Sequence, residues 1–178
     1  MKICMIFMQH KIKARVIMFD IDPIKFVHEL VEIYSNAEKK EKLTSLIREM
    51  LLREIVSNLD LLSEVKNLCK RKNDPLNIEE RIRLLQHLQF DFFEFSRNTG
   101  IPLSDVIKGD FKVNTASKYA SKMKKYTSNA QLVEKTYSRM RMQFILAKEN
   151  ITKRSDSIGY TIELCLNAKL QIEEQLRH

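Results

Sequence analysis

The stretch around which the rest of the chain is arranged covers residues 129–151, a helical pattern that contains neither glycine nor proline. Apolar side chains recur there at alternating steps of three and four, which places them on one face of an α-helix suited to an antiparallel partner. This stripe consists of Ala130, Val133, Tyr137, Met140, Phe144, Ala147 and Ile151. Further apolar side chains lie outside it, at Leu132, Met142, Ile145 and Leu146. The second half of the helix is therefore apolar almost all round, and we expect several neighbouring helices to enclose it.

The rest of the chain is also typical of helices. Only 3 Gly and 3 Pro occur in 178 residues, so the residues needed for many strands and tight turns are scarce. The pattern predicts an all-α fold, a bundle of five or six antiparallel helices, in a single domain over residues 22–178. The predicted helices cover residues 22–36, 38–70, 78–99, 115–126, 129–150 and 156–177.

Local signals predict where several of these helices begin and end. Asn77 is expected to cap the helix over 78–99, and Gly100 is expected to end it in the left-handed conformation, with Pro102 just beyond. Ser128 is expected to cap the central helix. Residues 104–108 are expected to form a short helical turn that Gly109 closes.

Residues 1–21 are expected to form an N-terminal extension, irregular or with a short strand near residues 16–19. Its apolar run is broken by Gln9 and His10, so it fits neither a secretory signal nor a transmembrane span. Met18 is an alternative natural start. The chain has 3 widely spaced cysteines and no CxxC motif, which is typical of reduced thiols and a cytoplasmic protein.

The positive charge of the chain is concentrated in one region. Of the formal net charge of +8, residues 109–154 carry eleven Lys or Arg against three acidic residues. Such a block is a solvated face, a nucleic-acid surface or a surface for other acidic partners. The candidate nucleic-acid-binding residues are Lys118, Lys122, Lys124, Lys125, Lys135, Arg139, Arg141 and Lys148.

These candidates do not form one continuous track on the predicted helices. Lys118, Lys122 and Lys125 share a narrow stripe of the helix over 115–126, and Tyr119 and Tyr126 are expected to face the core. On the central helix the basic residues project in two directions more than 100° apart.

The sequence provides no motif for a metal ion or a cofactor. The 4 histidines have no second ligand at the spacing of a zinc or di-iron site, and the glycine-rich phosphate-binding motifs are absent. We therefore expect no metal and no cofactor.

One short motif keeps an enzymatic alternative open. Arg81 precedes His87 by six positions, which resembles in spacing the Arg and His signature of the helical ribonucleases of the HEPN group. The resemblance implies that Arg81 and His87, brought together from two subunits of a dimer, act on the scissile phosphate of RNA.

Two features of the predicted core need partners. Phe90, Phe92, Phe93 and Phe95 are four of 9 phenylalanines, and they form either core and contact surface or a ligand pocket. Asn58 lies beside the apolar stripe of the helix over 38–70 and requires a hydrogen-bond partner if it is buried.

The apolar positions outnumber those that one side of each helix needs. This excess favours a non-enzymatic interaction or assembly module that forms a homodimer, with one face of the central helix serving a second subunit. The alternative is a protein that binds RNA or DNA through residues 118–148.

Overall fold

The computed structural model describes residues 37–70, 75–151 and 155–177. The extension expected over 1–21, the helix expected over 22–36 and the alternative start at Met18 lie outside these residues. The described residues form seven helices and no strand, apart from an isolated bridge between Asp110 and Ser128. The helices are α3 (Ala37–Leu68), α4 (Pro75–Leu85), α5 (Asp91–Asn98), α6 (Leu103–Val106), α7 (Ala120–Met123), α8 (Asn129–Lys148) and α9 (Ser155–Leu176). The predicted all-α class is confirmed.

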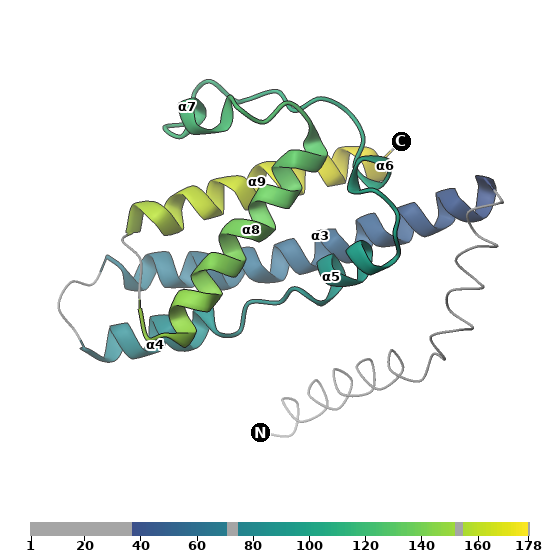
Figure 1. Ribbon diagram of the computed structural model, residues 1–178. Coiled ribbons are helices and arrows are strands. Elements are labelled where there is room, and N and C mark those ends of the chain that lie inside the picture. Colours follow the sequence, from purple (N-terminus) through teal and green to yellow (C-terminus); the bar gives the residue numbers. More distant parts are fainter. Residues whose placement is uncertain (1–36, 71–74, 152–154, 178) are drawn as a thin grey trace, which may run out of the picture. The chain divides into compact units, whose positions relative to one another are not determined.

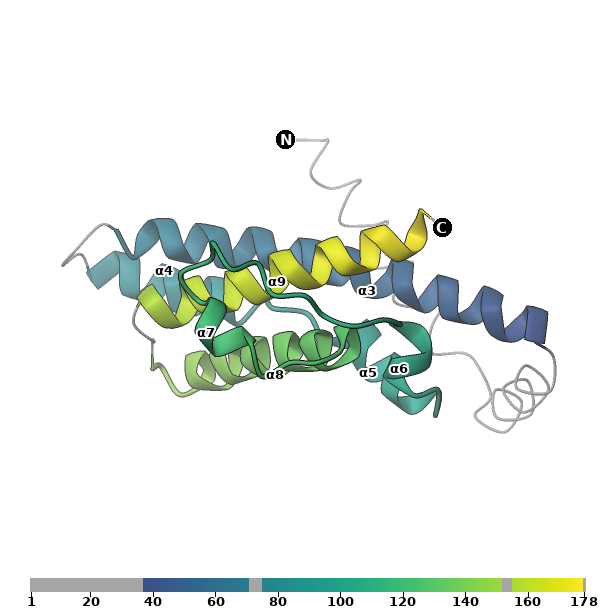
Figure 2. The same ribbon diagram turned by 90° about the horizontal axis from the view of Figure 1, so that it is seen from above.

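The chain divides into two compact units, Met1–Lys42 and Leu43–His178. Of the first unit the structure describes only residues 37–42, the opening turns of α3. The second unit contains the rest of α3 and all the other described helices. Within it α3 and α9 run in opposite directions, and α8 runs back along α9 (Figure 1 and Figure 2).

The three long helices build the core of the second unit. Each contributes apolar side chains that are almost completely removed from water, and burial of one such side chain stabilises the fold by about 1.5–3 kcal/mol. They include Leu51, Ile55 and Leu62 of α3, Leu132, Val133 and Met140 of α8, and Leu164, Cys165 and Ile172 of α9. The periodic apolar stripes thus identify the core of all three helices.

The central helix predicted from the sequence is α8, and Ser128 caps it as expected, because its Oγ accepts a hydrogen bond from the Gln131 amide at 3.2 Å. The predicted stripe is buried from Ala130 to Ala147, with Phe144 half-buried. Ile151 lies beyond the end of the helix and is 51% exposed.

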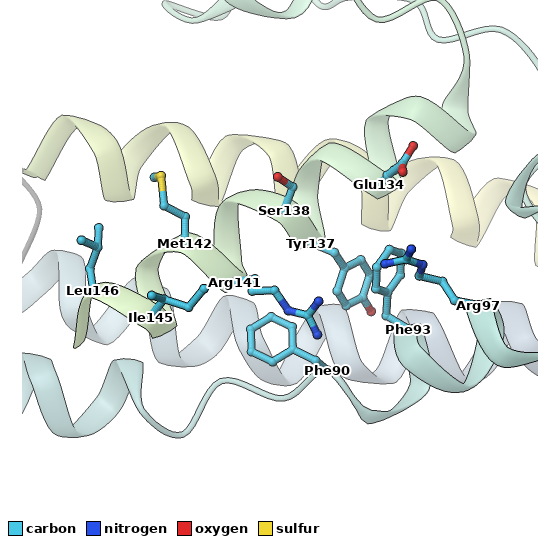
Figure 3. A pocket seen from close by; sticks show the side chains of 10 residues that line it. All are labelled: Phe90, Phe93, Arg97, Glu134, Tyr137, Ser138, Arg141, Met142, Ile145 and Leu146. Carbon is cyan, nitrogen blue, oxygen red and sulfur yellow. The ribbon is translucent and has the colours of Figure 1, made fainter. Parts of the chain in front are cut away.

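The expectation that neighbouring helices enclose the second half of α8 is wrong. Ile145 is 52% exposed, and Met142 and Leu146 are half-buried. These side chains line a groove instead of the core (Figure 3). In the described part of the chain, α8 has an apolar face that no other helix covers.

The single helix predicted over 78–99 is also wrong, because the structure has two helices there, α4 and α5, joined by an irregular link. The side chain of Asn58 on α3 holds this link from both sides: its Nδ2 donates to the Gln89 carbonyl at 2.7 Å, and its Oδ1 accepts from the Gln89 amide at 2.8 Å. Asn58 is completely buried, so these bonds supply the partner that the sequence required. They use backbone groups of Gln89 that a continuous helix needs for itself.

The basic helix predicted over 115–126 is reduced to α7, a single turn. Before α7, Asn114 Oδ1 accepts from the Ala116 amide at 3.0 Å, and Ser117 Oγ accepts from the Tyr119 amide at 3.2 Å. Short polar side chains that bond to nearby amides favour turns over a helix. Tyr119 and Tyr126 are nevertheless buried and the lysines between them are exposed, as the sequence predicted.

Apart from the start of α4, the remaining boundaries agree with the predictions to within about two residues. Gly100 has a positive φ angle of 70°, which fits its expected role as a helix stop. Gly109 also has a positive φ, 86°, but α6 has already ended at Val106, before it. The helix after the turn begins at Pro75 instead of behind an Asn77 cap, because proline is well suited to the first helical position. Among the described helices, none combines the length and the apolar character that crossing a membrane requires.

Candidate functional site

An open groove of about 420 Å³ lies between α8 and α5, and we call it the α8 groove (Figure 3). Seven of its lining residues come from α8, two from α5, and one from the link before α5. They are Phe90, Phe93, Arg97, Glu134, Tyr137, Ser138, Arg141, Met142, Ile145 and Leu146. Aromatic and aliphatic side chains dominate this lining, so the groove suits an apolar occupant.

The floor of the groove is a stacked pair of aromatic rings. The rings of Phe93 and Tyr137 are nearly parallel, at 8°, with centroids 4.1 Å apart. Both side chains are buried, Phe93 at 7% and Tyr137 at 1% exposure. A buried stacked pair of this kind has few rotamers to adopt, so the floor is rigid.

A buried carboxylate on α3 holds α5 in place beneath this floor. Glu54 accepts hydrogen bonds from the Phe92 amide at 2.9 Å and from the Phe93 amide at 3.1 Å, one on each carboxylate oxygen. These are first-turn amides of α5, which have no partner within their own helix. Glu54 therefore replaces a local cap, and Phe90, the residue before α5, makes no side-chain cap bond.

Glu54 is 2% exposed, and this burial raises the pKa of its carboxyl above the usual value of 4.5. The hydrogen bonds from the Phe92 amide, the Tyr137 hydroxyl and the Phe93 amide oppose the shift, because they stabilise the charged form. Burial also raises the pKa of the Tyr137 hydroxyl, and the neighbouring Glu54 charge adds to this increase. Tyr137 thus remains protonated and able to donate.

Charged side chains lie on the rim of the groove. Arg141 forms an ion pair with Glu94 of α5, and its guanidinium lies 5.6 Å from the centre of the Phe90 ring. Arg97 and Glu134 are exposed at one end (Figure 3). The apolar centre is therefore bordered by both signs of charge.

The structure brings five of the eight predicted basic residues into two groups. Lys118, Lys122 and Arg139 gather at two tyrosine rings where α7, α8 and α9 meet. Arg141 and Lys148 lie over Phe90 and Phe144 on the groove side of α8. Three further candidates are not in either group: Lys124 and Lys125 are exposed after α7, and Lys135 is half-buried on α8.

The residues of the ribonuclease hypothesis lie on either side of a helix end. Arg81 is half-buried within α4, and His87 follows the end of α4 and is exposed. Their joint action on RNA stays a prediction. Arg83, the other arginine of this segment, donates to both carboxylate oxygens of Glu80 at 2.8 and 2.6 Å. Among the described His, Cys, Asp and Glu side chains, no three come together to hold a metal ion.

Sequence reasoning missed Glu54 and most of the groove. Glu54 lies between Leu51 and Ile55 of the apolar stripe, and an acidic residue at such a position is the sequence feature that could have indicated a buried carboxylate. In the phenylalanine cluster, Phe93 belongs to the core and also lines the groove with Phe90; a role in ligand binding stays a prediction. No signal pointed to Arg97 or Ser138.

No protein-family model, no curated protein and no solved structure matches the chain.

Proposed function

We propose that the chain is a non-enzymatic helical module that assembles with a second copy of itself through the α8 groove. The observation that carries this proposal is Ile145, a large aliphatic side chain 52% exposed in the wall of an apolar groove. Covering such a half-exposed side chain is worth about 1 kcal/mol, and Met142 and Leu146 add to the same surface. Contiguous apolar surface bordered by polar groups is typical of a protein interface.

The outward face of α8 fits a second α8 in the antiparallel direction. Ser138 and Ile145 are seven residues apart and therefore lie on the same stripe of the helix. In an antiparallel pair centred between residues 141 and 142, Ser138 of one copy faces Ile145 of the other. The small serine leaves room for the isoleucine, which then packs against the Phe93 and Tyr137 floor. Two-fold symmetry produces the same contact a second time.

The charges along α8 fit the same arrangement. Glu134, Arg141 and Lys148 also recur every seven residues, along one edge of the exposed face. In this register Glu134 of one copy lies on the same edge as Lys148 of the other, within one residue of the same level. Arg141 lies near the two-fold axis and faces Arg141 of the second copy. The ion pair with Glu94 of the same chain balances the charge of each Arg141. The surface is thus complementary to itself, as a two-fold interface requires.

The chemistry of the groove favours contact over catalysis. Its centre is made of aromatic and aliphatic side chains, and its charged groups lie on the rim or are paired within the chain, as Arg141 is. A partner that covers the apolar centre leaves these rim charges close to water, where they select the partner and its register.

Replacement of Ile145 by glutamate tests the proposal. At micromolar concentration, size-exclusion chromatography with light scattering is expected to give the mass of a dimer for the wild type and of a monomer for Ile145→Glu. Two unpaired charges in the interface weaken association by about 4 kcal/mol, or roughly a thousand-fold.

Ile151→Glu is the matched control, because Ile151 is 51% exposed and does not line the groove. This variant is expected to remain a dimer, and circular dichroism of all three proteins checks that the helices are kept. A monomeric wild type, or equal behaviour of the two variants, contradicts the proposal.

A further inference from the structure

A cluster of cations and tyrosines lies where α7, α8 and α9 meet, apart from the α8 groove. The Tyr119 and Tyr160 rings have centroids 5.4 Å apart. The amine of Lys122 lies 5.7 Å from the first centroid and 5.6 Å from the second, and the guanidinium of Arg139 lies 5.2 Å from the second. Lys118 lies 4.7 Å from the Tyr119 ring. We call these five residues the cation cluster.

The two tyrosines are a fixed support for these cations. Tyr119 is 6% exposed, and its hydroxyl donates to the Asp156 carbonyl at 3.2 Å. The same hydroxyl lies against Gly159, so a side chain at position 159 would collide with it. Tyr160 is also 6% exposed, and its hydroxyl lies 3.0 Å from that of Tyr126. Because both rings are buried and covered by cations, they cannot stack on a nucleobase; they position the positive charges.

The positive charge of the cluster is poorly balanced within the described residues. Lys118 lies 3.8 Å from Asp156, and both side chains are largely exposed, so this pair is weak. Among the described side chains, neither Lys122 nor Arg139 forms an ion pair. The Arg139 guanidinium reaches only Ser157 Oγ, at 3.5 Å, and its Nε is buried without a hydrogen-bond partner in this part of the chain. A half-buried guanidinium without a counter-charge is costly, and a bound anion would relieve that cost.

The start of α9 adds to the same field. Ser157, which contacts Arg139, lies in the first turn of this 22-residue helix, where the macrodipole is positive. The exposed Lys124 and Lys125 follow directly after α7 and extend the basic surface. An anion at Lys122 and Arg139 is thus attracted by several groups at once.

We propose that the cation cluster binds phosphate groups of a nucleic-acid backbone, with Arg139 and Lys122 as the principal contacts and Lys118 beside them. Arginine offers paired N–H donors to phosphate oxygens, and lysine offers a mobile charge. A membrane surface fits less well, because the large apolar side chains between residues 117 and 126 are buried and cannot insert into lipid. Contacts to the backbone alone imply binding without sequence preference and with steep salt dependence.

A salt titration with a fluorescently labelled DNA duplex tests this proposal. Fluorescence anisotropy between about 50 and 200 mM salt gives the slope of log Kd against log salt. In the triple variant Lys118→Gln/Lys122→Gln/Arg139→Gln the slope is expected to fall by about 0.9 for each phosphate that the protein no longer neutralises, about 2.7 in all. Neutralisation of three phosphates corresponds to a roughly forty-fold change in affinity over this salt range.

The control Lys66→Gln/Lys70→Gln/Arg177→Gln removes the same charge elsewhere on the protein and is expected to keep the wild-type slope. If thermal denaturation shows that replacement of Arg139 disturbs the fold, the double variant Lys118→Gln/Lys122→Gln decides, because both lysines are exposed.

Four results would each overturn the proposal. The first two are no binding of the duplex by the wild type, and equal slopes in the cluster and control variants. The third is binding to phosphatidylglycerol vesicles without binding to the duplex. The fourth is that polyglutamate displaces the duplex as effectively as unlabelled DNA does at the same concentration of charge. The measurement does not depend on the α8 groove, so it remains decisive whether or not the chain forms a dimer.

Discussion

At the scale of single residues, the fold depends on a few polar side chains placed inside an apolar core. Glu54 is the clearest case, because its carboxylate on α3 accepts hydrogen bonds from the Phe92 and Phe93 amides in the first turn of α5 and also contacts Tyr137. Its burial is tolerated because the carboxylate oxygens receive hydrogen bonds that replace water. A residue of this kind links the core to the α8 groove, whose floor is formed by Phe93 and Tyr137.

The raised pKa of Glu54 predicts a specific pH dependence of stability. Because the folded-state pKa lies above 4.5, the folded protein holds this proton over a pH range in which the unfolded chain has lost it. The contribution of Glu54 to the free energy of unfolding therefore falls as pH rises from about 4.5 through the folded-state pKa, and is constant above it.

Glu54→Gln removes this titration, so the stability of the wild type relative to the variant is expected to be greater near pH 4.5 than near pH 7.5. Urea denaturation of both proteins across this range measures the difference. A difference that is constant, or that grows with pH, contradicts the assigned direction.

At the scale of helices, the sequence predicted the long elements well and the interruptions poorly. The helices α3, α8 and α9 follow from apolar periodicities that extend over at least five turns, and such a pattern depends little on other parts of the chain. The break between α4 and α5 has its cause 31 residues away, in the bonds between Asn58 and Gln89. No local pattern around Gln89 contains that information.

The candidate site was less predictable than the fold for a related reason. The sequence indicated that α8 has more apolar positions than one core needs, and Ile145 was among them. Which of these positions remain open depends on where α5 lies, and Glu54 of α3 determines that. The basic residues were recognised from the sequence, but their grouping at Tyr119 and Tyr160 required α7 and α9 to be placed in space.

The role of Asn58 in this break is testable by truncation. Asn58→Ala leaves the amide and the carbonyl of Gln89 without their partner, and we expect a decrease of about 2–3 kcal/mol in the free energy of unfolding. Asn67→Ala removes an exposed asparagine from the same helix and is expected to change it by less than about 0.5 kcal/mol. Chemical denaturation compares the two; equal effects would show that the break does not depend on Asn58.

At the scale of the whole molecule, the two proposed surfaces use different sides of α8. Ser138 and Ile145 lie on the side of the groove, and Arg139 lies toward α9, where it contacts Ser157. Assembly through the groove therefore leaves the cation cluster open, and each dimer carries two of them. A nucleic acid long enough to reach both would bind more tightly than one that reaches a single cluster.

The central claim is that the exposed face of α8 meets its own copy in the antiparallel direction, with Glu134 of one chain on the same edge as Lys148 of the other. Sedimentation equilibrium of three charge-reversal variants tests it most directly. Glu134→Lys and Lys148→Glu each place like charges opposite each other twice per dimer, and each is expected to raise the dimer dissociation constant about ten-fold or more. The double variant Glu134→Lys/Lys148→Glu restores opposite charges and is expected to return the constant close to the wild-type value. A double variant that dissociates at least as readily as the single variants, or single variants that associate like the wild type, would contradict the antiparallel α8 pair.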